Sequence, residues 1–306
     1  MNPAIVTTLP PKTRHKFFSP ARVSAIACNT LLELVRLKVF YFLLLFALLI
    51  IGCSGFTSIF DFQFQEQFQI LKDVSLGSMS IFTLMLSILA TAMMLPKDIE
   101  DRTLYTILAK PVPRFEYIMG KLLGVFSLLL ISTLVMSAMF VIALYAKQQI
   151  VINNTLHQGA GIPPDQVKAM IEGVKSQTFT VSLIPCLITI YLKSVLFAAL
   201  TMLISTFATS SIFTIFIAFT VYFIGSIEGL AREYWYSTPN GSETAKILMG
   251  LVALFFPDLQ LFNLVDDIVA GNTIAMGLFV KTAGLGVVYT FVYSFVSYVV
   301  FAFKEL

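Results

Sequence analysis

The chain has 306 residues, of which 58% are hydrophobic and only 12% are charged. A soluble domain usually carries about twice that charged fraction, so the composition excludes an ordinary water-soluble protein. The formal net charge of +3 says little by itself, and we expect no nucleic-acid partner.

Uncharged apolar runs recur along the chain, and each is close to the roughly 20 residues that a helix needs to cross a bilayer. The runs are continuous rather than alternating, which indicates helices and not barrel strands. We therefore expect an all-α integral membrane protein with six transmembrane helices. The expected spans are residues 39–60, 74–95, 122–146, about 187–204, 212–231 and 282–303.

The chain begins with a polar, basic and proline-containing segment, residues 1–19, which predicts a flexible tail. Ser19 and Pro20 then have the residue types of an N-cap and a first helical position. Apolar residues recur at helical spacing from Val23 to Val35, which predicts an interfacial amphipathic helix before the first span. An ordinary extension of the first span is the alternative. Residues 20–306 form a single membrane domain in this interpretation.

The fourth and fifth spans share a long uncharged segment, residues 194–227. Only residues 205–211 suit a turn, so the fourth span must begin near Leu187 and include Lys193. A lysine at that depth can extend its ammonium group towards the interface. Residues 247–257 are apolar but too few to cross, which predicts a re-entrant or interfacial segment before span six.

Lys and Arg residues decide the predicted orientation. Both termini and the loop at residues 96–121 hold most of the 20 Lys and Arg residues. Loops rich in these residues stay in the cytoplasm. We therefore expect a multi-pass plasma membrane protein with both termini and this loop on the cytoplasmic side.

The loop at 96–121 is the most strongly charged part of the chain. Its charged residues are Lys97, Asp98, Glu100, Asp101, Arg102, Lys110, Arg114, Glu116 and Lys121. The acidic residues favour the positive end of a short helix, which Pro111 cannot continue. Leu104 and Leu108 fall on one face of that helix. We expect a short cytoplasmic helix that presents an apolar ridge to a soluble partner; a solvated loop that only sets topology is the alternative.

The same loop resembles the cytoplasmic signature of ABC exporter permeases of the type-2 class. The pattern is an acidic pair, a threonine, a leucine, Pro-Val-x-Arg, an aromatic residue and Gly-Lys. The matching residues are Asp98, Glu100, Thr103, Leu108, Pro111, Val112, Arg114, Tyr117, Gly120 and Lys121. Arg102 departs from the pattern, because many members have glycine at this position.

The resemblance implies that residues 97–109 form a coupling helix that docks on a cytoplasmic ABC ATPase subunit. The docking residues that it implies are Asp98, Glu100, Arg102, Thr103, Leu104, Leu108 and Arg114. It also implies a bacterial inner-membrane exporter that pairs with a second copy or a paralogue, with spans two and five along the export path. The candidates for contacting a substrate there are Phe213, Phe216, Phe219, Phe223 and Lys193, although lipid contact or packing also accounts for the phenylalanines.

The chain lacks the G-x-x-x-x-G-K-[ST] phosphate-binding motif, so ATP and Mg²⁺ are expected in a separate partner subunit. Its three cysteines and two histidines are widely separated, and we expect no metal site or cofactor in this chain. We therefore expect a transporter subunit and not an enzyme. Two alternatives stay open: a multipass membrane enzyme that uses Asp258, Asp266 and Asp267, and a scaffold that recruits a soluble partner through the loop.

Overall fold

A computed structural model describes residues 18–55, 64–100, 113–158, 163–208, 210–237, 258–271 and 274–304. Every regular element in these ranges is a helix, so the predicted all-helical class is confirmed for them. In chain order the helices are α1 (Pro20–Val35), α2 (Lys38–Ser54), α3 (Phe64–Ala92), α4 (Met94–Glu100), α6 (Arg114–Gln158), α7 (Pro164–Thr178), α8 (Leu183–Phe207), α9 (Ser211–Ser237), η2 (Gln260–Phe262), α11 (Val265–Val269) and α12 (Met276–Phe303).

Several of these helices are long and apolar enough to cross a membrane. Within the described ranges there are four such segments: Gln65–Asp98, which combines α3 with most of α4; Arg114–His157 in α6; Asp165–Phe207, which combines α7 with α8; and Met276–Phe303, which is α12. The pair formed by α1 and α2 adds a fifth if its 68° bend lies within one span. The chain is therefore a multi-pass helical membrane protein with four or five candidate spans. The apolar part of α9, Ser211–Ile227, is shorter than these, and the six-span layout stays a prediction.

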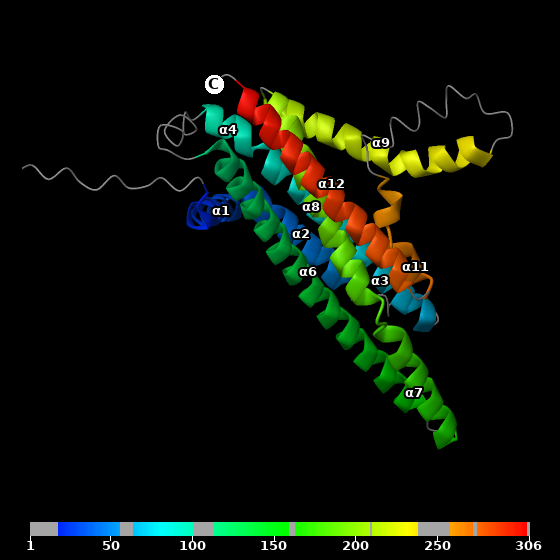
Figure 1. Cartoon of the computed structure of the whole chain (residues 1–306). Coiled ribbons are helices and arrows are strands. Elements are labelled where there is room, and N and C mark those ends of the chain that lie inside the picture. The colour runs from blue at the N-terminus through cyan, green and yellow to red at the C-terminus, as the bar shows by residue number, and fades with distance from the viewer. Residues whose placement is uncertain are drawn as a thin grey trace, which may run out of the picture.

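Helix α8 forms the centre of the bundle. It packs against α3, α6 and α12, and every residue from Lys193 to Met202 is buried. Figure 1 shows α6, α8 and α12 running along the same diagonal of the molecule. A helix that is buried on all sides lies in the interior of a bundle.

The helices extend beyond the apolar runs that predicted them. Helix α3 begins at Phe64 although the second span was expected from residue 74, and α6 continues to Gln158 although the third was expected to end at 146. The far end of α6 packs against α7, and the two project together from the bundle (Figure 1). The helices are longer than the expected spans because hydropathy predicts only the part of a helix that meets lipid. The helix itself continues through polar residues until a helix-breaking residue or a cap ends it.

Helix α1 starts at Pro20, as predicted, and packs against the first turns of α6 through two glycines. A Cβ atom on Gly120 would lie 2.7 Å from the Cβ of Ile26, and one on Gly124 would lie 2.6 Å from the Cβ of Thr30. Small residues four apart allow such close approach between two helices. The membrane-interface position of α1 stays a prediction.

Replacement of Gly124 by leucine tests this packing. We expect Gly124→Leu to lower the free energy of unfolding by about 2–3 kcal/mol, the upper part of the range for overpacking, because the backbone of α1 cannot yield at this contact. Unfolding in mixed micelles with increasing dodecyl sulfate measures the change. Gly284→Leu in α12 is the control, since a Cβ there meets nothing within 4 Å. Equal losses in the two variants would contradict the close packing of α1 on α6.

Candidate functional site

A group of charged side chains and one tyrosine lies at the end of the bundle beside residues 100 and 113, which flank the charged loop. There α4, the start of α6 and the end of α12 gather (Figure 1). We call this group the loop-base network. It consists of Arg22, Glu33, Lys97, Asp98, Glu116, Tyr117 and Lys121.

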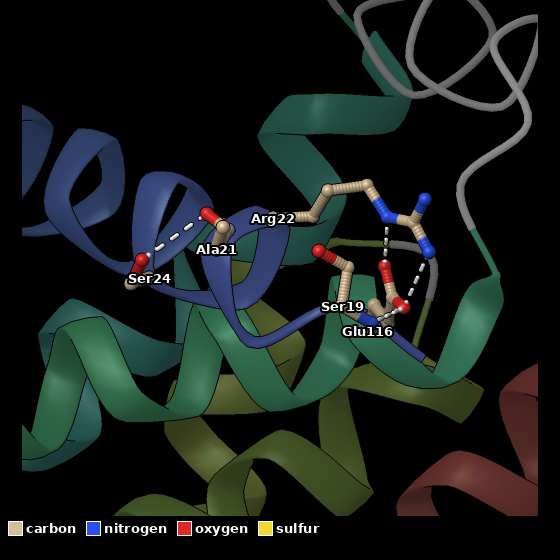
Figure 2. Close-up of polar contacts among 5 residues, drawn as sticks. All are labelled: Ser19, Ala21, Arg22, Ser24 and Glu116. Atoms are coloured by element: carbon tan, nitrogen blue, oxygen red, sulfur yellow. Dashed lines mark hydrogen bonds and ion pairs between the residues drawn. The ribbon is translucent and has the colours of Figure 1, made fainter. Parts of the chain in front are cut away.

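Glu116 is the most deeply buried acid in this network, with 0% of its surface exposed. Its carboxylate accepts hydrogen bonds from Arg22 Nε at 2.6 Å, Arg22 Nη2 at 2.7 Å and the backbone nitrogen of Ser19 at 2.7 Å. Figure 2 shows the three donors arranged around the two carboxylate oxygens. A buried carboxylate needs such partners to replace its lost hydration. This contact therefore holds the beginning of α1 on the beginning of α6.

Asp98 forms the second centre of the network. It is buried in α4, accepts a hydrogen bond from the hydroxyl of Tyr117, and forms an ion pair with Lys121, whose Nζ lies 2.8 Å from the carboxylate. Lys121 Nζ also lies 3.7 Å from Glu33 Oε2, and Glu33 Oε1 accepts a hydrogen bond from Lys97 Nζ at 3.0 Å. These contacts join α1, α4 and α6 into one unit.

The network fixes both ends of the segment at residues 101–112. Helix α4 ends at Glu100, just before this segment, and α6 begins at Arg114, just after it. Because Asp98 and Lys121 are largely buried, their attraction is weakly screened by water and salt. These contacts therefore hold α1, α4 and α6 together on both sides of this segment.

Arg114 belongs to a separate contact at the same end. Its Nη1 donates hydrogen bonds to the backbone oxygens of Phe301, Ala302 and Lys304, at 3.2, 2.7 and 3.1 Å. The last carbonyl groups of a helix have no partner within that helix, and a cation there also opposes the negative end of the helix dipole. Arg114 thus caps α12 and joins it to α6.

The predicted docking residues divide into two groups. Asp98 and Arg114 are described, and both bind other parts of this chain. Glu100 lies in α4, but its side chain is outside the described part, as are the whole residues Arg102, Thr103, Leu104 and Leu108. The docking contacts of all seven residues stay predictions. Asp98 and Arg114 also contact other parts of this chain, namely Lys121 and the end of α12.

Sequence reasoning missed the pair formed by Glu116 and Arg22. A signal was present, because Glu116 stands four residues before Gly120 and eight before Gly124, and residues at this spacing share one helix face. That is the face of α6 on which α1 packs. An acid in line with two small residues indicates a buried contact with a cation from another helix, although it does not identify the cation.

The predicted substrate-path residues lie in two different environments. Phe213, Phe216 and Phe223 on α9 are exposed, whereas Phe219 packs against a buried cluster. Lys193 lies within α8, as predicted, where it is buried and its ammonium group lies 5.8 Å from the centre of the Tyr222 ring in α9. An aromatic face stabilises a cation in such a position.

The acids of the membrane-enzyme alternative make local contacts. Asp258 Oδ1 accepts a hydrogen bond from the backbone nitrogen of Gln260 at 2.9 Å, and Asp266 Oδ2 accepts one from the amide of Asn263 at 2.8 Å. In the part of the chain that the structure describes, no three His, Cys, Asp or Glu side chains are placed to hold a metal ion.

In comparisons with known proteins, no family model and no curated protein matches this chain.

Proposed function

We propose that the chain is the membrane-spanning subunit of an ATP-driven ABC exporter, with a soluble ATPase docked on residues 97–109. The observation that carries the proposal is the loop-base network, in which Asp98, near the start of the docking segment, pairs with Lys121 of α6, and Glu116 of α6 pairs with Arg22 of α1. These ion pairs connect the start of the docking segment to the membrane helices, so movement of a soluble subunit docked there is transmitted into those helices.

The contacts among the signature residues also support the proposal. Asp98, Tyr117 and Lys121 are up to 23 positions apart in the sequence, and they meet in one hydrogen-bonded group. An acid, an aromatic hydroxyl and a lysine in contact at the base of the loop are consistent with the proposed coupling role.

The proposal also assigns a role to each partner and a location to the chain. ATP and Mg²⁺ bind to the partner ATPase, which supplies the energy of transport. A second copy of this chain or a paralogue completes the path, and the exposed Phe213, Phe216 and Phe223 of α9 face that copy or the substrate. The loop and both termini lie in the cytoplasm of a bacterium, and the chain lies in its inner membrane.

Purification of the chain from its own membranes in a mild detergent tests the proposed function. We expect a soluble ATPase to co-purify at a fixed ratio and to be identified by mass spectrometry. Added ATP should then be hydrolysed by the complex and not by the isolated chain. A chain that purifies alone would overturn the proposal, and a fixed partner without ATPase activity would favour the scaffold.

Reporter fusions test the proposed orientation. We expect an alkaline phosphatase fused after residue 160 to be active, because the far end of α6 would lie outside the cytoplasm, and one fused after residue 112 to be inactive. A fluorescent protein that matures only in the cytoplasm should give the opposite pattern at the two positions. Reversed activities would contradict the orientation that the Lys and Arg distribution predicts.

A further inference from the structure

An apolar groove of about 380 Å³ opens where α6, α8 and α12 meet. Its walls include Phe115 and Leu123 of α6, Val195 of α8, and Val287 and Phe291 of α12. Thr290 and Ser294 also line it, but their hydroxyl groups donate to backbone oxygens within α12. The groove therefore offers an apolar ligand almost no competing hydrogen-bond donors.

Two cations, Arg114 and Lys304, lie beyond the Phe115 end of this groove and are not part of its lining. Arg114 directly precedes the wall residue Phe115, and the backbone oxygen of Lys304 accepts a hydrogen bond from Arg114. Lys304 Nζ itself donates to the backbone oxygen of Thr206 at 3.0 Å. Among the described residues, neither cation forms an ion pair with a carboxylate, and the nearby Glu116 is already paired with Arg22. The Phe115 end of the groove is thus bordered by positive charge that the described part of the chain does not neutralise.

We propose that this groove binds one acyl chain of an anionic phospholipid, with the phosphate at Arg114 and Lys304. Three of the four clearly crossing segments of the bundle, those that contain α6, α8 and α12, form the groove, so hydrocarbon surrounds its opening. Basic sites between membrane helices bind anionic headgroups, and arginine suits the geometry of phosphate. The site requires only that the helices cross a membrane, and it goes beyond the proposed transport function.

A second copy of this chain fits the groove less well than a lipid. Three apolar helical segments of a second copy, α2, the Ser211–Ile227 part of α9, and α12, contain no Asp or Glu residue. They would fill the apolar groove and leave both cations without a counter-charge. A phospholipid supplies the apolar chain and the anion in one molecule, and it would join α6 to α12 beside the loop-base network.

The experiment is a count of the phospholipids that remain on the chain after purification in a mild detergent. We expect about one anionic phospholipid per chain in the wild type. Val287→Trp fills the groove and should reduce retention by at least about tenfold, which corresponds to about 1.4 kcal/mol. Val288→Trp is the matched control, because Val288 is 59% exposed and Val287 58%, but only Val287 lines the groove. Retention that Val287→Trp leaves unchanged would overturn the proposal.

The headgroup is tested in nanodiscs by native mass spectrometry with phosphatidylglycerol and phosphatidylcholine. The wild type should retain phosphatidylglycerol preferentially, and Lys304→Gln should weaken this preference several-fold, whereas Lys281→Gln near the other end of α12 should not. Equal retention of the two lipids by the wild type would overturn the anionic site. A dimer that Val287→Trp dissociates, with lipid retention unchanged, would assign the groove to a second copy and also overturn the proposal.

Discussion

Loss of both export and ATPase binding is the result that we expect when Leu104 is replaced by proline or the charge of Glu100 is reversed. A proline inside a helix costs about 3 kcal/mol, which alone corresponds to more than about 100-fold weaker binding if the partner recognises the helix. Charge reversal in a docking surface places like charges together or leaves a partner cation unpaired. Transport of a reporter substrate and the amount of co-purified ATPase measure the effect.

Membrane insertion should not change in either variant, because both positions lie outside the expected spans. Glu66→Lys is the matched control for charge reversal, since Glu66 is exposed in the first turn of α3, at the other end of that helix from the loop. If either variant exports at the wild-type rate, the coupling role of residues 97–109 is wrong. Loss of insertion would instead show that the loop is needed for folding.

A large loss of stability is expected from Arg22→Ala. The substitution leaves the fully buried Glu116 with one backbone donor in place of three donors. Removing Arg22 leaves the Glu116 carboxylate without its charged partner, so we expect a loss in the free energy of unfolding that clearly exceeds that of the control variant below. Unfolding in mixed micelles measures the change. Arg36→Ala, at an exposed arginine of the same region, should alter the free energy of unfolding by less than about 0.5 kcal/mol.

The double variant Arg22→Met, Glu116→Leu separates a buried charge without a partner from a simple loss of packing. It removes both charges and keeps apolar volume at the contact, so it should regain most of the stability that Arg22→Ala loses. A double variant as unstable as the single one would show that the packing of α1, and not the ion pair, stabilises this end. In the proposed exporter, Arg22→Ala should also weaken the dependence of transport on ATP.

Local sequence signals located several elements correctly. Ser19-Pro20 predicted the start of α1, and the turn at 205–211 lies where α8 ends at Phe207 and α9 begins at Ser211. Lys193 was placed within a helix by the length of the uncharged segment alone. These features depend on residues close together in the chain, so composition, spacing and caps are sufficient to predict them.

The sequence by itself therefore determined the helical class and the presence of several helices long and apolar enough to cross a membrane, because hydropathy and charge are local properties. Only the tertiary structure decided which distant groups meet. Arg22 and Glu116 are 94 positions apart, the bend between α1 and α2 is 68°, and Asp98 turns inward to Lys121 and Tyr117. Such contacts depend on how closely the helices approach each other and at what angle. The close approach at Gly120 and Gly124 is evident only in the fold, where Ile26 and Thr30 of α1 lie against these glycines.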